Sequence, residues 1–254
     1  MLSIIIPVLN EVESLPLLLT HLGGSASAPS SIEVIVVDGG STDGTASCVA
    51  NFKSRSPFKR LVCISSEKGR PKQMNVGAAH AKGEVLYFLH ADSFPPKQFD
   101  AHILSEVRKG NPAGCFRMQF DSTHWWLRLA GWLTQFNWRA CRGGDQSQFI
   151  SRELFDEVGG YDEDFAIYED NVLINQLYAR NRFTVINRPL TTSARLYRER
   201  GIAHVQFHFW TIYLKRWLGA DAEALAAYYK KHLGGPSKGA PLHESIVAEA
   251  VSER

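Results

Sequence analysis

The strongest constraint on the fold is an apolar run that ends abruptly, at residues 85–89. Five apolar residues rich in β-formers suit a strand buried on both faces, as in the parallel sheet of an α/β protein. Prolines follow at 95–96, so we expect this strand not to continue past Ser93. His90 and Asp92 then come at the carboxyl end of a central strand, which is the edge where open α/β sheets bind ligands.

His90 and Asp92 are two positions apart, and alternate residues of a strand share one face. The pattern therefore predicts that both side chains address one point. An imidazole and a carboxylate there suit a divalent cation that carries phosphate oxygens. Taken alone, the pair fits a solvated strand exit better, so the interpretation depends on the rest of the chain.

Apolar runs and helical spacings alternate along the rest of the chain. The runs that indicate strands are residues 2–9, 32–37, 61–64, 116–120, a short stretch before 150, and 183–186 ahead of Pro189. The spacings that indicate helices are 15–22 stopped by the glycines at 23–24, a segment after Asp43, and 69–79, 124–139, 154–161, 169–177, 207–218 and 222–233. This alternation predicts parallel β-α-β units in a central sheet with helices on both faces.

The composition is that of a folded globular protein, with 44% apolar and 21% charged residues in a chain of 254. A formal net charge of +2 argues against a nucleic-acid partner. The four cysteines form no Cys-x-x-Cys pair, which favours reduced thiols over a disulfide frame or a zinc site. No basic leader precedes the first strand, and no apolar run reaches the roughly 20 residues that span a bilayer. We therefore expect a cytoplasmic protein, at most peripheral at the inner face of the membrane.

Polar residues follow three of the predicted strands, at Asn10 and Glu11, at Asp38, and at residues 90–92. These exits converge in space if the strands are parallel. Glycines next to Asp38 permit close approach of the backbone to a ligand, although a tight turn with a helix-capping aspartate explains them equally simply. The segment 70–73 adds Arg, Lys and Gln near the same edge, where cations suit a pyrophosphate or remain in solvent.

The order of these motifs resembles the family 2 glycosyltransferases of the GT-A fold. The resemblance rests on Ile4-Ile-Ile-Pro-Val-Leu-Asn-Glu11, Val36-Val-Asp-Gly-Gly-Ser-Thr-Asp-Gly-Thr45 and Phe88-Leu-His-Ala-Asp92. A bacterial subgroup is similar in more detail, through Gly69-Arg70, Gln73-Met-Asn75, Gly77, Gly144-Asp-Gln146, Glu169-Asp170 and Thr191-Thr-Ser-Ala-Arg195. Over residues 2–200 the resemblance implies a Rossmann-like GT-A domain. It also implies an inverting transfer from a nucleotide-diphospho-sugar, usually a UDP-sugar, to an acceptor hydroxyl, with Mg2+ or Mn2+.

The resemblance also implies roles for particular residues. Asp92 matches the last aspartate of the metal-binding Asp-x-Asp motif, whereas His90 replaces the first, which leaves open whether His90 touches the metal, the sugar or neither. We expect Arg195 and Arg198 to meet the leaving diphosphate, and Asp145, Gln146 and Trp132 to lie on the acceptor side. The residues expected around the donor are Pro7, Asn10, Glu11, Asp38, Arg70, Gln73, Asn75, His90, Ala91 and Asp92.

An inverting transfer needs one carboxylate near the acceptor hydroxyl as its base. Glu169 and Asp170 open a predicted helix, and adjacent helical residues point about 100° apart, so only one of them is expected to face the reaction. The resemblance favours Asp170, with Glu169 in a supporting contact and Asp145 as the next choice. A purely structural role for these acids, as partners of the helix dipole, is the alternative.

The predicted domains are a GT-A domain at 1–200, aromatic-rich helices at 201–235 and a polar tail at 236–254. The aromatic helices 124–139 and 207–218 carry Trp and Tyr beside Lys and Arg, which suits a membrane interface or a lipid-linked acceptor. Packing on the domain or a homodimer interface is the alternative, and is favoured for 207–218 because apolar residues surround most of that helix.

Two other functions fit parts of the sequence. A sugar-phosphate nucleotidyltransferase needs a Gly-rich, basic loop after its first strand, but residues 10–13 are acidic at that place. A non-catalytic nucleotide-sugar-binding or membrane-surface scaffold would bind UDP without turning over any donor.

Overall fold

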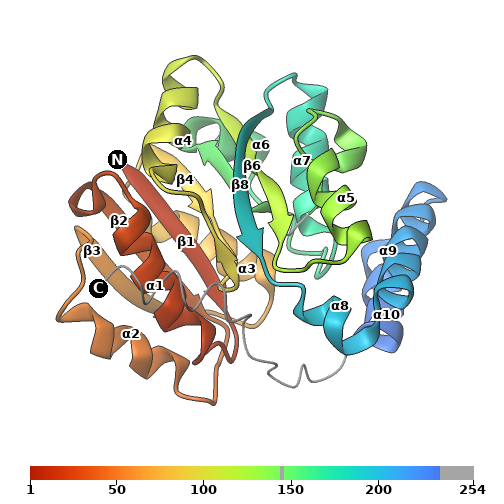
Figure 1. Ribbon diagram of the computed structural model, residues 1–254, viewed down its shortest axis with the longest axis horizontal. Coiled ribbons are helices and arrows are strands. Elements are labelled where there is room, and N and C mark those ends of the chain that lie inside the picture. Colours follow the sequence, from red (N-terminus) through yellow and green to blue (C-terminus); the bar gives the residue numbers. More distant parts are fainter. Residues whose placement is uncertain (144–145, 235–254) are drawn as a thin grey trace.

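One eight-stranded sheet forms the centre of the protein (Figure 1). The computed structural model describes residues 1–143 and 146–234. The strand order is β3-β2-β1-β4-β7-β6-β8-β5. The strands are β1 (Leu2–Val8), β2 (Ile32–Asp38), β3 (Arg60–Ser65), β4 (Val85–Phe88), β5 (Ser93–Phe94), β6 (Ala113–Phe120), β7 (Gln148–Ser151) and β8 (Thr184–Thr192).

The sheet is mixed but mostly parallel, as the sequence predicts. Strands β3, β2, β1 and β4 run parallel to one another, and β8 runs parallel to β6. Strand β7 is antiparallel to both β4 and β6, and β5 is antiparallel to β8. The carboxyl ends of β1, β2 and β4 therefore meet at one edge.

Helices cover both faces of the sheet (Figure 1). One face buries the apolar sides of α1 (Ser14–Ser25), α2 (Thr45–Lys53) and α4 (Phe99–Arg108), and the other those of α3 (Arg70–His80), α6 (Arg152–Val158) and α7 (Glu169–Ala179). Single 3-10 turns lie at Pro29–Ser31 and Arg139–Cys141. Helix α3 packs unusually close, because a Cβ at Gly77 would lie 2.4 Å from Ile5 Cγ2. This close packing sets the start of α3 beside the sheet edge.

Two predicted helices differ in their ends. Helix α1 continues through the glycines at 23–24, which were expected to stop it, and ends at Ser25. The predicted helix 124–139 is shorter, because α5 (Trp125–Leu133) ends before Thr134. The buried Arg142 guanidinium donates to the carbonyls of Thr134 at 2.5 Å and Phe136 at 2.6 Å. Those carbonyls would accept hydrogen bonds from backbone amides within a continuous helix, so the Arg142 side chain competes with the helix.

Two predicted strands also differ. The chain forms the short strand β5 after the turn that follows β4, and β5 pairs with Thr191 and Thr192 of β8. Strand β8 continues beyond Pro189, where the sequence predicts an end. A register shift between Phe116 and Arg117 of β6 accommodates the proline, because the ladder is already irregular there.

The C-terminal helices pack together at one end of the molecule (Figure 1). They are α8 (Arg195–Arg200), α9 (Ile202–Trp217) and α10 (Ala222–His232). Their small core of Val205, Ile212 and Leu225 packs against residues 165–168, which lie just before α7. The helical appendage thus contacts the segment that leads into the candidate catalytic helix. The predicted tail at 236–254 lies outside the described residues.

Candidate active site

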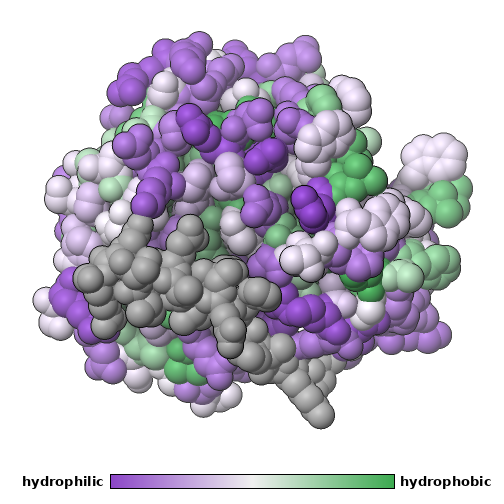
Figure 2. All heavy atoms as spheres, in the orientation of Figure 1, coloured by the Kyte–Doolittle hydropathy of each residue, from purple (hydrophilic) through white to green (hydrophobic). Residues whose placement is uncertain are grey.

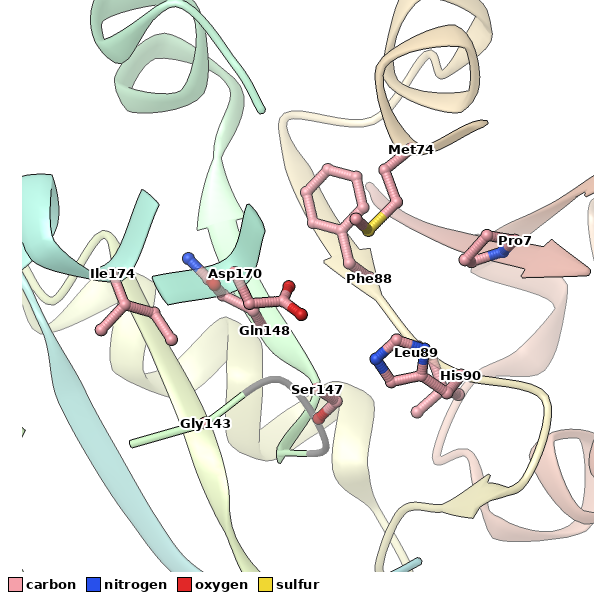
Figure 3. A pocket seen from close by; sticks show the side chains of 10 residues that line it. All are labelled: Pro7, Met74, Phe88, Leu89, His90, Gly143, Ser147, Gln148, Asp170 and Ile174. Carbon is pink, nitrogen blue, oxygen red and sulfur yellow. The ribbon is translucent and has the colours of Figure 1, made fainter. Parts of the chain in front are cut away.

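A small cavity opens at the carboxyl edge of β1 and β4 (Figure 3). Its walls come from five parts of the chain: the end of β1, the first half of α3, the end of β4, the start of β7 with the loop before it, and the first turns of α7. The lining residues are Pro7, Met74, Phe88, Leu89, His90, Gly143, Ser147, Gln148, Asp170 and Ile174. Two sequence-predicted donor residues and the favoured base therefore share one cavity.

The two candidate bases lie in the first turn of α7 but have different surroundings. Glu169 is 1% exposed, and its Oε1 accepts a hydrogen bond from Arg70 Nη1 at 3.1 Å. Asp170, 6% exposed, lines the cavity together with Ile174, one turn further along the same helix. Both carboxylates lie at a helix N-terminus, whose positive end stabilises negative charge. Glu169 is thus neutralised by its ion pair with Arg70, while Asp170 faces the cavity.

Gln148 on β7 is a cavity residue that the sequence analysis missed. It pairs with Phe88 across the β4–β7 ladder and is 3% exposed. Neither its Nε2 nor its Oε1 has a hydrogen-bond partner in the described part of the chain. An unpaired buried amide is costly, and such groups in folded proteins call for a specific explanation. Its position on the cavity wall makes it available to a polar ligand.

Gln146, which the sequence analysis did select, is satisfied within the protein. Its Nε2 donates to the Cys141 carbonyl at 3.0 Å, and its Oε1 accepts from Cys115 Sγ at 3.7 Å. Asp145 lies outside the described residues. Trp132 is 51% exposed and packs edge-on against Phe136. Of the predicted acceptor residues that the structure describes, neither Gln146 nor Trp132 lines the cavity.

Tyr161 was also missed, and it lies behind the candidate bases. Its hydroxyl is buried and has no hydrogen-bond partner among the described residues. Burial raises its pKa well above the ordinary value, and the charges of Asp170 and Glu169 raise it further. Tyr161 therefore keeps its proton at neutral pH and adds no negative charge to the site.

His90 and Asp92 face different neighbours. Strand β4 ends at Phe88 and residues 91–92 form a turn, so the shared strand face that the sequence predicts does not form. His90 lines the cavity, and its ring points toward the Asp170 carboxylate from the opposite wall (Figure 3). Ala91 is buried in the core. Asp92 instead lies close enough to Glu11 for its charge to affect that carboxyl group.

Glu11, Asp92 and Arg195 form a charged group near the carboxyl ends of β1 and β4. Burial raises the pKa of Glu11, and the Asp92 charge adds to this, while Arg195 opposes it. Arg195 Nη2 lies 3.5 Å from Glu11 Oε1. Arg198 is directed away from this group, because its Nη1 pairs with Asp121 Oδ1 at 2.9 Å. Of the two predicted diphosphate ligands, Arg195 is the one beside Glu11.

This charged group fits a divalent cation only in part. Two nearby carboxylates, Glu11 and Asp92, are suitable hard oxygen ligands. No cluster of three or more metal-ligating side chains occurs among the described residues. Mg2+ is commonly held by one or two carboxylates plus the phosphates of a substrate. The residues present therefore fit an ion that arrives with a diphosphate better than one held by protein ligands alone.

The other predicted donor residues shape the sheet edge. Asp38 Oδ1 accepts from the backbone and hydroxyl of Ser41, at 2.9 and 2.6 Å. Asn10 adopts a left-handed backbone, with φ of 57°, and its Oδ1 accepts from Thr42 N at 2.9 Å. The exits of β1 and β2 are thus joined by side-chain hydrogen bonds, which hold Asp38 at the edge.

Gln73 and Asn75 belong to α3 and have structural partners elsewhere in the fold. Gln73 is buried, and its Nε2 donates to the carbonyls of Val8 and Val37, both at 2.8 Å. Asn75 bonds both the amide and the carbonyl of Tyr161 at 2.9 Å. These residues thus hold the strand ends and the turn before α7 in place.

The fold is shared with nucleotide-sugar-bound proteins of known structure. Residues 1–349 of Staphylococcus aureus TarS, in complex with UDP-GlcNAc, align with a TM-score of 0.62 and 21% identity, covering 76% of this chain and 58% of that one. Mannosyltransferase PcManGT from Pyrobaculum calidifontis, in complex with GDP-Man and Mn2+, aligns with a TM-score of 0.61 and 20% identity, covering 98% and 70%. The fold is therefore GT-A, as the sequence predicts.

The sequence comparisons agree with the fold. The family model of Glycosyl transferase family 2 matches residues 3–177. Undecaprenyl-phosphate 4-deoxy-4-formamido-L-arabinose transferase of Enterobacter sp. (strain 638) is 24% identical over 211 residues, covering 82% of this chain and 60% of that protein. The chain spans between 32% and 60% of the length of this and other curated relatives. The chain belongs to glycosyltransferase family 2.

Proposed function

We propose that this glycosyltransferase moves a hexose-type sugar, with inversion, from a UDP-sugar to an acceptor hydroxyl. The observation that supports this proposal most strongly is that two buried polar groups line one cavity. They are the Asp170 carboxylate and the Gln148 amide, which has no hydrogen-bond partner among the described residues. A carboxylate held at a helix N-terminus can accept a proton, and an unpaired amide can bind sugar hydroxyls. The complexes of structurally similar proteins with UDP-GlcNAc and with GDP-Man support a nucleotide-sugar donor.

In this mechanism Asp170 acts as the general base. The acceptor oxygen attacks the anomeric carbon while its proton passes to Asp170 Oδ. The bond between the anomeric carbon and the diphosphate oxygen breaks, and UDP leaves with the electron pair. Because attack comes from the side opposite the leaving group, the anomeric configuration inverts. Glu169 is held in its ion pair with Arg70, so its role is to orient Arg70.

The donor's nucleotide end is assigned to the sheet edge. Asp38 accepts a hydrogen bond from the nucleoside through Oδ2, because the hydrogen bonds from Ser41 use Oδ1. Arg195 lies beside Glu11 and supplies positive charge for the diphosphate. Mg2+ or Mn2+ held by Asp92 would neutralise the charge that develops on the leaving diphosphate. His90 is assigned to the sugar, because it lines the cavity together with Asp170. It is not assigned to the charged group that contains Asp92.

The subgroup with Gly-Arg-x-x-Gln-Met-Asn and Gly-Asp-Gln motifs is also part of this proposal. Arg70 pairs with Glu169, and Gln73 ties the ends of β1 and β2 together. These contacts bring together motif residues that are far apart in the sequence. A nucleotidyltransferase is disfavoured, because the exit of β1 carries Glu11 and Glu13 where a triphosphate would need cations.

A thermal-shift panel tests the donor. The purified chain is heated with UDP, GDP and their sugar conjugates, each with and without Mn2+. A ligand that binds only the folded state stabilises it by about 2.7 kcal/mol at a hundredfold excess over Kd. The donor that stabilises most is then incubated with the protein, and release of the nucleoside diphosphate is measured. Stabilisation by UDP without turnover of any donor would instead support a non-catalytic binding protein.

A further inference from the structure

The exposed apolar side chains of this chain are concentrated in two segments. Among the described residues, every large apolar side chain classed as exposed belongs to 125–138 or to 207–218. Trp217 is the most exposed of them, at 81%. We call this group the aromatic surface; its members are Trp125, Leu129, Trp132, Trp138, Phe207, Trp210, Tyr213, Leu214, Trp217 and Leu218.

The two segments meet in space. The rings of Trp126 and Trp210 are 6.0 Å apart in an edge-on arrangement, and Trp126 Nε1 donates to Gln206 Oε1 at 3.2 Å. Helices α5 and α9 therefore present one surface. Figure 2 shows white and green spheres, the colours of intermediate and high hydropathy, gathered over this side of the molecule. Exposed apolar patches of this kind mark interaction sites in soluble proteins.

Within the two segments that carry the aromatic surface, all charged side chains have one sign. Residues 124–142 contain three arginines and residues 202–220 contain one lysine and one arginine, yet neither segment contains Asp or Glu. The whole chain has 26 acidic residues, so their absence from both segments is selective. Arg142 is buried, but Arg128 and Lys215 are exposed. The surface thus combines tryptophan and aliphatic side chains with exposed cations.

This chemistry matches an anionic lipid surface better than a second protein. Trp and Tyr favour the boundary between lipid headgroups and acyl chains, and Lys and Arg beside them bind anionic headgroups. Within residues 1–143 and 146–234, no helix combines the length and apolar composition needed to cross a bilayer. We propose that the aromatic surface docks the protein on anionic membranes, with α5 and α9 lying in the headgroup region.

The aromatic surface reaches the wall of the cavity. Gly143 lines the cavity and lies close to Tyr213: a Cβ added to this glycine would be 3.5 Å from the Tyr213 hydroxyl. The Tyr213 ring lies 5.5 Å from that of Tyr168, the residue just before Glu169. A membrane in contact with α9 is therefore adjacent to the cavity. It follows, on the basis of the proposed function, that the acceptor is an amphiphile whose hydroxyl enters the cavity while its tail stays in the bilayer.

Vesicle flotation tests the docking without any donor, so it is independent of the proposed function. The probes are phosphatidylcholine vesicles with and without phosphatidylglycerol. We expect binding to the anionic vesicles at low salt and weaker binding as salt screens the cations. The double variant Trp217→Ser/Leu218→Ser should bind about tenfold or more weakly, because two exposed apolar side chains are lost.

Charge variants provide a matched control. Arg128→Glu should weaken binding to anionic vesicles about fivefold or more. Lys59→Glu makes the same charge change at an exposed position before β3 and should bind like the parent protein. No flotation at low salt, or equal flotation of the double variant, would overturn the proposal. The proposal would also be overturned if ultracentrifugation showed the parent to be a dimer and the double variant a monomer, while neither protein bound vesicles.

The acceptor is tested with the radiolabelled donor that gives the largest thermal shift. The protein is incubated with vesicles of a total bacterial lipid extract, and the organic phase is then counted. Label in the organic phase, reduced in Trp217→Ser/Leu218→Ser, supports an amphiphilic acceptor. Label that passes only to water-soluble acceptors would overturn that part. The double variant should keep its UDP affinity, since neither residue lines the cavity.

Discussion

Arg70 Nη1 donates to Glu169 Oε1 at 3.1 Å, across 99 positions of sequence. The contact joins the first residue of α3 to the first residue of α7. It neutralises one of two adjacent carboxylates and leaves Asp170, its neighbour, to face the cavity. Two acidic residues that look equivalent in the sequence therefore have different surroundings, and this difference can be measured.

Asp170→Asn should lose sugar transfer by roughly 10²–10⁴-fold, the usual contribution of a general base, while keeping its affinity for UDP. Single-turnover transfer and calorimetric UDP titration measure the two effects separately. Glu169→Gln is the matched control: it weakens the contact with Arg70 but retains Asp170, so its loss of transfer should be smaller. Normal transfer by Asp170→Asn with an inactive Glu169→Gln would mean that the roles are reversed.

Gln148→Met should leave the free protein as stable as the parent or more stable by about 1 kcal/mol, because it removes a buried amide that has no hydrogen bond. The same variant should lose about tenfold in affinity for the UDP-sugar relative to UDP. Thermal unfolding and competitive titration of the two ligands give the two values.

The control for this glutamine is Gln146→Met on the same segment. Gln146 is hydrogen-bonded to Cys141 and Cys115, so its replacement should destabilise the fold by about 1 kcal/mol. Its preference for the UDP-sugar over UDP should remain. If Gln148→Met instead destabilises the protein and binds both ligands normally, Gln148 has a structural role.

The buried central strands and one closely packed helix were predictable from the sequence. The unbroken apolar runs of β2 and β4 identify buried parallel strands, because both of their faces must be covered. The small residues of α3 predict its close packing, which Gly77 provides. These patterns lie within a few residues of the elements that they determine.

Which residues line the site could not be predicted from the sequence. This depends on contacts that form only in the folded chain and that no local sequence pattern indicates. Helix α5 ends early because Arg142, several residues beyond it, binds carbonyls that the helix would use. Gln146 and Gln148 are two positions apart, but only the first meets partners at Cys141 and Cys115. The one sequence signal for Gln148 was a polar residue next to the apolar pair at 149–150, on a strand that is buried in the sheet.

Stability should depend on pH through Glu33, which lies at the other end of the sheet. Burial alone would raise its pKa, but hydrogen bonds from Ser3, the Lys82 amide and Arg60 outweigh this and hold the pKa below its ordinary value. A lowered folded-state pKa means that the ionised form stabilises the fold. This stabilisation is fully present above the unfolded pKa, near 4.5, and is lost as pH falls through the folded pKa.

Glu33→Gln should therefore destabilise the protein by about 1–3 kcal/mol at pH 7, because its amide group faces Arg60, which is also a donor. Denaturant unfolding at pH 7 and at pH 3.5 or so, below the ordinary pKa of glutamate, measures the difference. The gap between parent and variant should narrow at the lower pH. A gap that is unchanged with pH would show that the ionised carboxylate adds nothing.

Asp92→Asn tests the proposed metal ligand. It should abolish the gain in UDP affinity that Mn2+ provides, because an amide is a far weaker ligand for a hard cation than a carboxylate. Affinity for UDP without metal should change little or rise, since a negative charge beside Glu11 is removed. Asp38→Ala, at the end of β2, is the control: it should weaken UDP equally with and without Mn2+, because it removes a nucleoside contact. Calorimetric titrations of the parent and both variants, with Mn2+ and with chelator, complete the comparison. If Mn2+ strengthens UDP binding to Asp92→Asn as much as to the parent, the ion is held elsewhere, and Glu11→Gln becomes the next variant to measure.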